Sequence, residues 1–305
     1  MSSVDLSVNV GPLKLKNPVL LASGTVGYGN EISEFLDLSK IGGIVTKSIS
    51  LLPRKGNPPQ RIVETPSGMM NAIGLANVGL EIFIKEKIPF LKEVKSDIIC
   101  NIAASSIEEY VECVKALNNE EAIKAFEINV SCPNVKEGGL IFGNDASAVG
   151  RITEKVRAAT DKPVIIKLSP NTASISRFAE VVKKEGGDIV SAINTLVGAA
   201  FDIWKKTPKI ANVTGGLSGP AIKPVAIAKV LEISRKVDIP IIGIGGISSW
   251  QDAVEFMIAG ASAFQLGTIN FVNPKLGNDI LTDLEDYCAK MGIENISDLT
   301  ASYKI

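Results

Sequence analysis

The sequence predicts an α/β fold, a closed (β/α)8 or TIM barrel of eight parallel strands surrounded by helices. Short runs rich in Val and Ile recur along the chain, and a longer segment with helical spacing of apolar residues follows most of them. Eight such runs are present, which is the number that closes this barrel. They occupy 18–23, 43–48, 98–103, 126–131, 163–169, 189–195, 240–246 and 263–268.

The helical segments and the chain length support the same fold. Helical patterns follow the third, fourth, fifth and seventh runs, at 106–117, 147–159, 176–186 and 250–260. The 305 residues exceed the about 250 of a typical barrel. Insertions after strands 2 and 6, at roughly 49–95 and 196–219, account for the excess. We therefore expect residues 1–305 to form a single barrel domain.

Composition excludes several classes of function. The 32 Lys and Arg balance 33 Asp and Glu, so no basic field favours nucleic acid or a membrane surface. The chain has no His, which excludes Ser-His-Asp and Cys-His catalysis and His-containing zinc sites. The N-terminus lacks the pattern of a signal peptide, and no apolar run approaches the about 20 residues of a spanning helix. We expect a cytoplasmic protein with reduced thiols.

The four cysteines are scattered along the chain. Cys100, Cys113, Cys132 and Cys288 form no C-x-x-C pair, so an iron–sulfur cluster would belong to another chain, and we expect no metal site here. Strand alternation places Cys100 on the outer face, while Cys113 and Cys288 fall in helical patterns. We interpret these three as packing residues.

Each of the eight runs ends in a small or hydrogen-bonding residue. Because active sites of such barrels lie at the carboxyl ends of the strands, these residues would form a polar ring around one mouth. Polar residues that simply mark strand ends are the alternative. The ring consists of Ser23, Lys47, Ser48, Asn101, Asn129, Ser131, Lys167, Asn194, Thr195, Gly245, Gly246, Gly267 and Thr268.

The fourth run alternates between apolar and polar residues. Glu127, Asn129 and Ser131 share one face, which we expect to point into the barrel. Glu127 would then be a buried carboxylate that needs a partner. The same alternation points Asn101 inward from the third run.

The seventh and eighth runs end in glycine-rich turns. The segment 240–248 is not a dinucleotide-binding motif, because a serine stands where G-x-G-x-x-G requires its third glycine. Gly245 and Gly246 followed by a helix that opens at Ser249 instead resemble a phosphate cradle, with Gly267 and Thr268 beside it. An ordinary tight turn is the alternative.

Cys132 differs from the other cysteines because it follows the fourth run and lies at the predicted mouth. A thiol near Lys47 or Lys167 would have a lowered pKa and could take a proton from a carbon acid. An inert loop cysteine is equally compatible with the spacing.

Asparagines are the other polar feature of this end. Asn71, Asn129, Asn134 and Asn194 offer amide donors and acceptors together, which suits a ligand with urea-like or imide-like edges. Turn formation is the alternative for any one of them.

Six segments, in order along nearly the whole chain, strongly resemble class 1 dihydroorotate dehydrogenases and most closely subclass 1B. They are 64–79, 129–139, 194–198, 212–224, 240–247 and 265–268. The cysteine within NVSCPN (129–134) is typical of class 1, whereas the membrane-associated class 2 enzymes carry Ser there. The resemblance implies that Cys132 removes the C5 proton of (S)-dihydroorotate while the C6 hydrogen moves as hydride to N5 of FMN. The product would be orotate, in pyrimidine (UMP) biosynthesis.

The resemblance also implies a set of binding residues. The substrate residues are Lys47, Asn71, Ala72, Ile73, Gly74, Leu75, Asn129, Asn134, Asn194 and Thr195. The FMN residues are Ser23, Lys47, Ser48, Asn101, Asn129, Lys167, Ile193, Gly219, Gly245, Gly246, Gly267 and Thr268. Lys167 would place positive charge near the pyrimidine end of the flavin, which favours its anionic reduced form.

Subclass 1B further implies a partner, an electron-transfer subunit that carries FAD and a 2Fe–2S cluster and passes electrons to NAD+. A homodimer of this chain would form the core of a heterotetramer. The alternatives are a fumarate-linked enzyme of subclass 1A, a related flavin barrel that reduces another pyrimidine, and a non-redox phosphate-binding isomerase or aldolase that uses Lys47 or Lys167. A scaffold protein is disfavoured by the polar ring.

Overall fold

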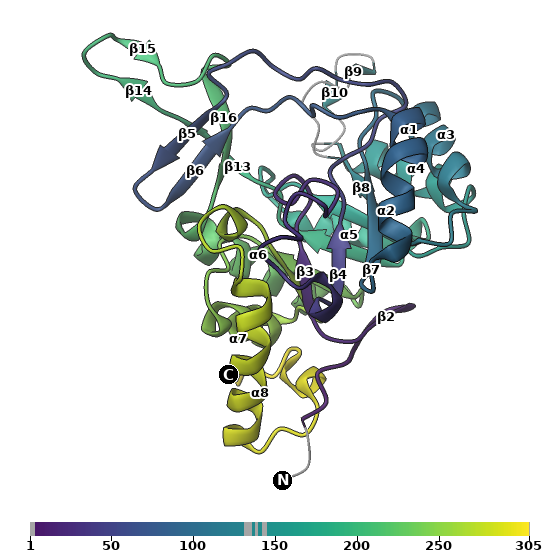
Figure 1. The fold of residues 1–305 in the computed structure, drawn as a ribbon, viewed down its shortest axis with the longest axis vertical. Coiled ribbons are helices and arrows are strands. Elements are labelled where there is room, and N and C mark those ends of the chain that lie inside the picture. Colours follow the sequence, from purple (N-terminus) through teal and green to yellow (C-terminus); the bar gives the residue numbers. More distant parts are fainter. Residues whose placement is uncertain (1–3, 131–135, 138–139, 142–144, 305) are drawn as a thin grey trace.

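Eight parallel strands close into a barrel in the computed structural model, which describes residues 4–130, 136–137, 140–141 and 145–304 (Figure 1). Each barrel strand pairs with the next one along the chain, and the last returns to the first, which confirms the predicted TIM barrel. The strands are β3 (Val19–Leu21), β4 (Gly43–Val45), β7 (Asp97–Ile102), β8 (Ile123–Asn129), β11 (Val164–Leu168), β12 (Ile189–Ala192), β17 (Ile241–Ile244) and β18 (Ala263–Leu266).

The barrel strands are buried on both faces, because the packed interior lies on one side and the helices on the other. This explains why their sequences are apolar almost throughout. Most of the predicted runs extend one to three residues beyond the observed strands. Lys47, Ser48 and Asn194 therefore lie in the loops that leave the barrel at the carboxyl ends.

Helices cover the outside of the barrel. All four predicted helices are confirmed within two residues at each end, and three of them begin at side chains that accept a backbone hydrogen bond, Ser106, Asp145 and Ser249. The sequence did not predict α2 (Ile88–Glu93) or α6 (Lys223–Lys236). Between β3 and β4, turns and a short 3-10 segment (Leu38–Lys40) take the place of an outer α-helix. The outer helices are α2 (Ile88–Glu93), α3 (Ile107–Leu117), α4 (Ala146–Arg157), α5 (Ile175–Lys184), α6 (Lys223–Lys236), α7 (Trp250–Ala259) and α8 (Leu276–Met291).

The two predicted insertions pair with each other. The first supplies β5 (Ile62–Thr65) and β6 (Gly68–Asn71), and the second supplies β13 (Leu196–Ala199) and β16 (Thr214–Ser218). Together they form one antiparallel sheet in the order β13-β16-β6-β5, at the end of the barrel to which the strands point (Figure 1). The first insertion is shorter than predicted, because α1 (Leu80–Ile82), a π-helical turn (Phe83–Lys87) and α2 supply the outer helix of the second unit.

A hairpin at the start of the chain lies against the opposite end of the barrel. It consists of β1 (Val8–Val10) and β2 (Leu13–Leu15), and its turn at Gly11 lies close to Asp188 and Pro240, which precede β12 and β17. The polar ring and the insertion sheet therefore share one end, and the N-terminal hairpin covers the other.

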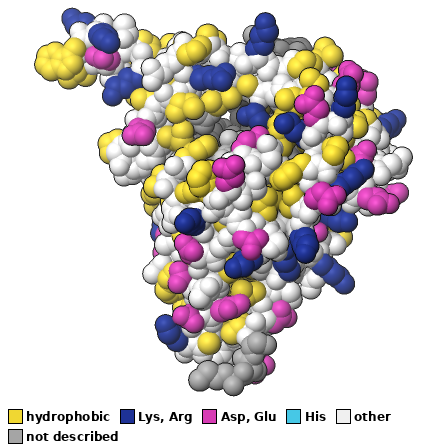
Figure 2. Space-filling view, in the orientation of Figure 1, with side chains coloured by type: hydrophobic (Ala, Val, Ile, Leu, Met, Phe, Trp, Pro, Cys, Tyr) yellow, Lys and Arg dark blue, Asp and Glu magenta, His cyan; other side chains and the backbone are white. Residues whose placement is uncertain are grey.

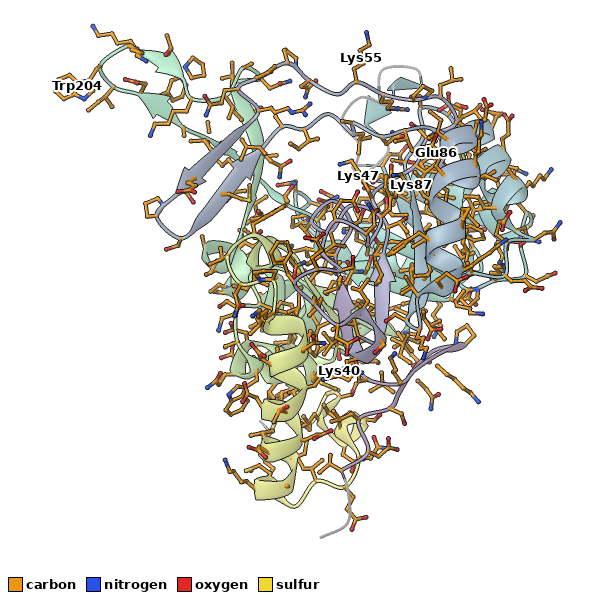
Figure 3. All side chains as sticks on the ribbon, in the orientation of Figure 1. Lys40, Lys47, Lys55, Glu86, Lys87 and Trp204 are labelled. Atoms are coloured by element: carbon orange, nitrogen blue, oxygen red, sulfur yellow. The ribbon has the colours of Figure 1, made fainter. Side chains whose placement is uncertain are left out.

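Charged side chains of both signs are interspersed on the face shown in Figure 2, in keeping with the near-zero net charge. The hairpin of β14 (Phe201–Asp202) and β15 (Thr207–Pro208) projects from the molecule, and Trp204 is exposed at its end (Figure 3). Among the helices of the described ranges, none has the length and apolar character needed to span a bilayer.

Candidate active site

Several residues of the predicted polar ring meet at the carboxyl end of the barrel. Asn129 ends β8 beside Lys167 of β11, its direct partner in the sheet register. The Asn194 side-chain amide donates to Asn129 Oδ1 at 3.3 Å, and Asn194 Oδ1 accepts from the Thr195 backbone N–H at 2.7 Å. The end of β8 and the loop after β12 therefore present connected amides.

A buried carboxylate lies below this row, at the centre of the barrel. Glu127 is fully buried, and its Oε1 accepts from Asn101 Nδ2 at 2.6 Å and lies 3.6 Å from Lys167 Nζ. Its Oε2 accepts from Ser191 Oγ and Gln265 Nε2, both at 2.8 Å. These residues come from β7, β8, β11, β12 and β18, so one carboxylate links five strands. The network confirms the prediction that Glu127 points inward and has a partner, and it holds Lys167 in place.

Sequence reasoning missed two members of this network, Ser191 and Gln265. Each is a polar residue within an otherwise apolar strand that is buried on both faces. That pattern is the signal that could have found them, because a buried polar side chain needs a hydrogen-bond partner.

Lys47 lies half-buried in the loop after β4, where its backbone N–H donates to the Gly27 carbonyl at 2.8 Å. Burial lowers the pKa of Lys47, the positive charge of Arg61 lowers it further, and Glu31 opposes both. Within the described ranges, no carboxylate lies at ion-pair distance from the Lys47 ammonium. Lys47 lies at the carboxyl end of the barrel, whereas Lys55 points to solvent (Figure 3).

The insertion sheet brings Asn71 to the same end. Asn71 ends β6 and pairs in register with Gly216 of β16, whose carbonyl lies 3.5 Å from Asn71 Nδ2. Thr195 Oγ1 occupies the space that a side chain at position 216 would need. Gly216 therefore lies between Thr195 and Asn71, and Asn71 begins the half-buried segment 71–75, which holds all five predicted substrate residues of this insertion.

Glycine turns from three loops meet on another side of the mouth. Gly219, Gly245 and Gly246 have φ values of 94°, 133° and 77°, a region that favours glycine. A Cβ added at Gly246 would lie 2.7 Å from the Gly219 carbonyl oxygen, so the two turns are in direct contact. Thr268 Oγ1 and Ser218 Oγ are hydrogen-bonded at 2.8 Å and join the loop after β18 to this pair. We call Gly219, Gly245, Gly246, Gly267 and Thr268 the glycine cradle.

The remaining predicted contacts flank these groups. Ser23 is half-buried, and its neighbour Ala22 lies next to Gly267. A Cβ added at Gly267 would be 3.8 Å from the Ala22 Cβ. Ser48 is buried directly after Lys47, and Ile193 is buried directly after β12.

The described cysteines have the structural character predicted for them. Cys100, Cys113 and Cys288 are fully buried, and burial raises the pKa of the first two to about 12 and also raises that of Cys288. None of the three is a thiolate near neutral pH. Ser131, Cys132 and Asn134 lie outside the described residues. In the part of the chain that the structure describes, no group of three or more His, Cys, Asp or Glu could hold a metal ion.

Comparison with known proteins identifies the family. Residues 5–288 match the family described as dihydroorotate dehydrogenase. The chain belongs to the dihydroorotate dehydrogenase family. It is 52% identical over 305 residues, the full length of both chains, to the "Dihydroorotate dehydrogenase B (NAD(+)), catalytic subunit" of Geotalea daltonii. Proteins of the same name from Geotalea uraniireducens and Bacteroides fragilis are 49% identical over 299 residues and 46% identical over 301 residues, with 98% and 99% of each chain covered.

Dihydroorotate dehydrogenases generally use a flavin, and the residues at this site fit one. Asn101 Oδ1 and Gln265 Oε1 are buried acceptors with no hydrogen-bond partner among the described residues. A flavin ring carries both donor and acceptor groups, and the phosphate of a flavin nucleotide suits the glycine cradle, where close approach leaves no room for a side chain at Gly219, Gly245 or Gly246. The site thus offers polar groups for a ring and a backbone surface for an anion.

Proposed function

We propose that this chain is the catalytic subunit of an NAD+-linked dihydroorotate dehydrogenase, which oxidises (S)-dihydroorotate to orotate in pyrimidine biosynthesis. One observation carries the proposal. Asn194 bonds to Asn129 and to the Thr195 backbone, and Gly216, which contacts Thr195, pairs with Asn71 although 145 residues of chain separate Asn71 from Gly216. The full-length identity of 52% to a relative of this name supports it.

We propose FMN as the flavin. Its phosphate would bind the glycine cradle, and its ring would lie near Asn101 and Lys167, above Glu127. When bound, FMN would accept the hydride from C6 of the substrate. Lys167 is positioned by its contact with Glu127, and its positive charge would lie beside the ring.

The chain's own residues would bind the substrate and move the proton. Asn71, Asn129 and Asn194 offer donors and acceptors that match the two N–H and two C=O groups of a dihydropyrimidine ring. Lys47 supplies positive charge for the substrate carboxylate, and its burial strengthens that attraction. The proposed base is Cys132, whose thiolate would take the C5 proton; this role rests on the family resemblance, as Cys132 lies outside the described residues.

We propose an electron-transfer partner as well. The relatives are named as catalytic subunits of NAD+-linked enzymes, which implies a second subunit in those enzymes. For this chain, the partner would carry FAD and a 2Fe–2S cluster, and two copies of the chain would form the core of the complex.

An anaerobic absorbance spectrum of the purified chain, taken before and after addition of (S)-dihydroorotate, tests the proposal. We expect a yellow protein whose flavin band bleaches. Cys132→Ala should stay yellow and bleach slower by about 10²-fold or more, the usual contribution of a general base. The matched control is Cys288→Ala, in helix α8 and away from the mouth, which should bleach at the wild-type rate.

Three results would count against the assignment. A colourless protein that does not bind added FMN would contradict the flavin. A yellow protein that is unchanged by dihydroorotate would contradict the substrate. Rapid oxidation of the reduced chain by fumarate, without a partner subunit, would contradict the NAD+-linked assignment.

A further inference from the structure

A polar bridge joins the starts of helices α6 and α7 beside the glycine cradle. Lys223, the first residue of α6, donates from Nζ to Asp252 Oδ1 at 2.6 Å and to Glu255 Oε2 at 2.7 Å, both on α7. Asp252 is buried, and its Oδ2 accepts from the backbone N–H and the Oγ of Ser248, both at 2.8 Å. The bridge therefore runs from α6 through Lys223 and Asp252 to the turn that follows β17.

The charges of the bridge leave little for direct ligand binding. Burial would raise the pKa of Asp252, but the hydrogen bonds from Lys223 and Ser248 outweigh it and lower the pKa overall, so the carboxylate is ionised. Lys223 thus faces two carboxylates, Asp252 and Glu255, which neutralise its positive charge. Its contribution to anion binding is therefore geometric and not a free charge.

The same lysine forms one wall of the cradle through its backbone. A Cβ added at Gly246 would lie 2.9 Å from the Lys223 backbone nitrogen and 2.7 Å from the Gly219 carbonyl oxygen. The turn at Gly246 is consequently packed directly against the first turn of α6. Two residues after Gly246, Ser248 is held by the Asp252 end of the bridge.

We propose that Lys223 and Asp252 are positioning residues for the cofactor phosphate. Their ion pair holds the 245–248 turn against the start of α6 and beside Gly219, so that backbone N–H groups of the glycine cradle face one anion. Anion binding by glycine-rich turns depends on such a convergence of N–H groups. The proposal rests on the proposed function, because the phosphate is that of FMN.

A purely electrostatic effect makes a different prediction. If the two side chains acted only through their charges, removing the Lys223 cation would weaken phosphate binding and removing the Asp252 anion would strengthen it. The positioning role predicts that either removal weakens it, because either one opens the bridge. The sign of the Asp252 effect therefore separates the two explanations.

The test compares FMN with riboflavin, which lacks the phosphate, by quenching of flavin fluorescence on titration of the full-length apoprotein. We expect Lys223→Met and Asp252→Asn each to raise the Kd for FMN by about tenfold or more, as for a lost charge-assisted hydrogen bond, and to change the Kd for riboflavin by less than about twofold. Lys223→Arg, which keeps a cation that can bridge to Asp252, should restore most of the FMN affinity. Glu255→Gln is the matched control, because Glu255 contacts Lys223 but is half exposed and does not bond to Ser248, and it should leave both Kd values unchanged.

The outcomes are distinct. Equal weakening of FMN and riboflavin by Lys223→Met and Asp252→Asn would show a general structural role and overturn the proposal, as would tighter FMN binding by Asp252→Asn. If Asp252→Asn does not fold, Asp252→Ala removes the same bridge and is held to the same criteria. If the wild-type protein binds FMN and all the variants bind it equally well, the positioning role of the bridge is overturned but the proposed function is not. If the wild-type protein binds neither flavin, both the proposed function and the positioning role are overturned.

Discussion

Substituting Glu127 by Gln tests the idea that one buried carboxylate holds the barrel interior together. Glu127 faces donors at both ends, Asn101 and Lys167 at Oε1 and Ser191 and Gln265 at Oε2. A Gln amide has an NH2 group at one end, which would face the Asn101 or the Gln265 amide nitrogen as these side chains are now oriented. Lys167, which is almost fully buried, also loses its counter-charge.

The expected cost follows from these contacts. Removing one partner of a buried ion pair costs about 3–5 kcal/mol, and each buried donor left unpaired costs about 1–3 kcal/mol. Because the contacts share one group they do not add, and we expect Glu127→Gln to lower the free energy of unfolding of the apoprotein by about 3–5 kcal/mol. Urea unfolding followed by circular dichroism measures this difference.

A surface ion pair provides the control. Lys183 and Asp238 lie 3.1 Å apart, with side chains 49% and 105% exposed, so Asp238→Asn should cost less than about 1 kcal/mol. The double variant Glu127→Gln with Lys167→Met, which removes the unpaired cation, should regain part of the loss. A Glu127→Gln variant as stable as Asp238→Asn would refute the reasoning.

Three further predictions concern the thiols, the cradle and Lys47. Iodoacetamide at pH 8 should label Cys132 and leave the three buried cysteines unmodified, because their raised pKa values keep them as thiols; mass spectrometry that finds label on a buried cysteine in the folded protein would contradict this. Gly246→Ala should raise the Kd for FMN by about tenfold or more, because its Cβ would lie 2.7 Å from a carbonyl oxygen. The control is Gly292→Ala, at a similar φ but in open space, which should cost only about 1 kcal/mol of stability and leave FMN binding intact. Lys47→Met should stabilise the apoprotein at pH 7, because burial lowers the pKa of Lys47, so the folded chain binds the Lys47 proton less tightly than the unfolded chain does. This gain in stability should shrink as the pH rises towards 10.5. Urea midpoints of the wild type and the variant that show no such trend would count against this prediction.

The position of Glu127 could be predicted because it depends on local chain geometry. Successive side chains of a strand point to opposite faces, so the alternation around Glu127 places it inside any barrel that uses this strand. The strand-end positions of Lys167 and Asn129 follow in the same way, since the carboxyl ends of parallel strands meet at one mouth.

Helix α6 shows where local patterns fail. It follows the insertion after β12, and its first turn contains a proline. That turn packs on the glycine turn at Gly246, which lies more than 20 residues later in the sequence. Helix α2 was missed because it lies in a stretch that resembled a single long insertion, although its residues cover the second barrel unit.

The sequence by itself determined the barrel, the polar mouth, the inward carboxylate and the absence of a His-based mechanism, because each depends on composition or on a period of a few residues. Only the tertiary structure decided that the two insertions share one sheet, that Asn71 meets Thr195 through Gly216, and that Lys223 bridges to Asp252. These contacts join residues 21 to 145 positions apart, and they depend on how the closed barrel arranges its loops in space, which no local pattern encodes.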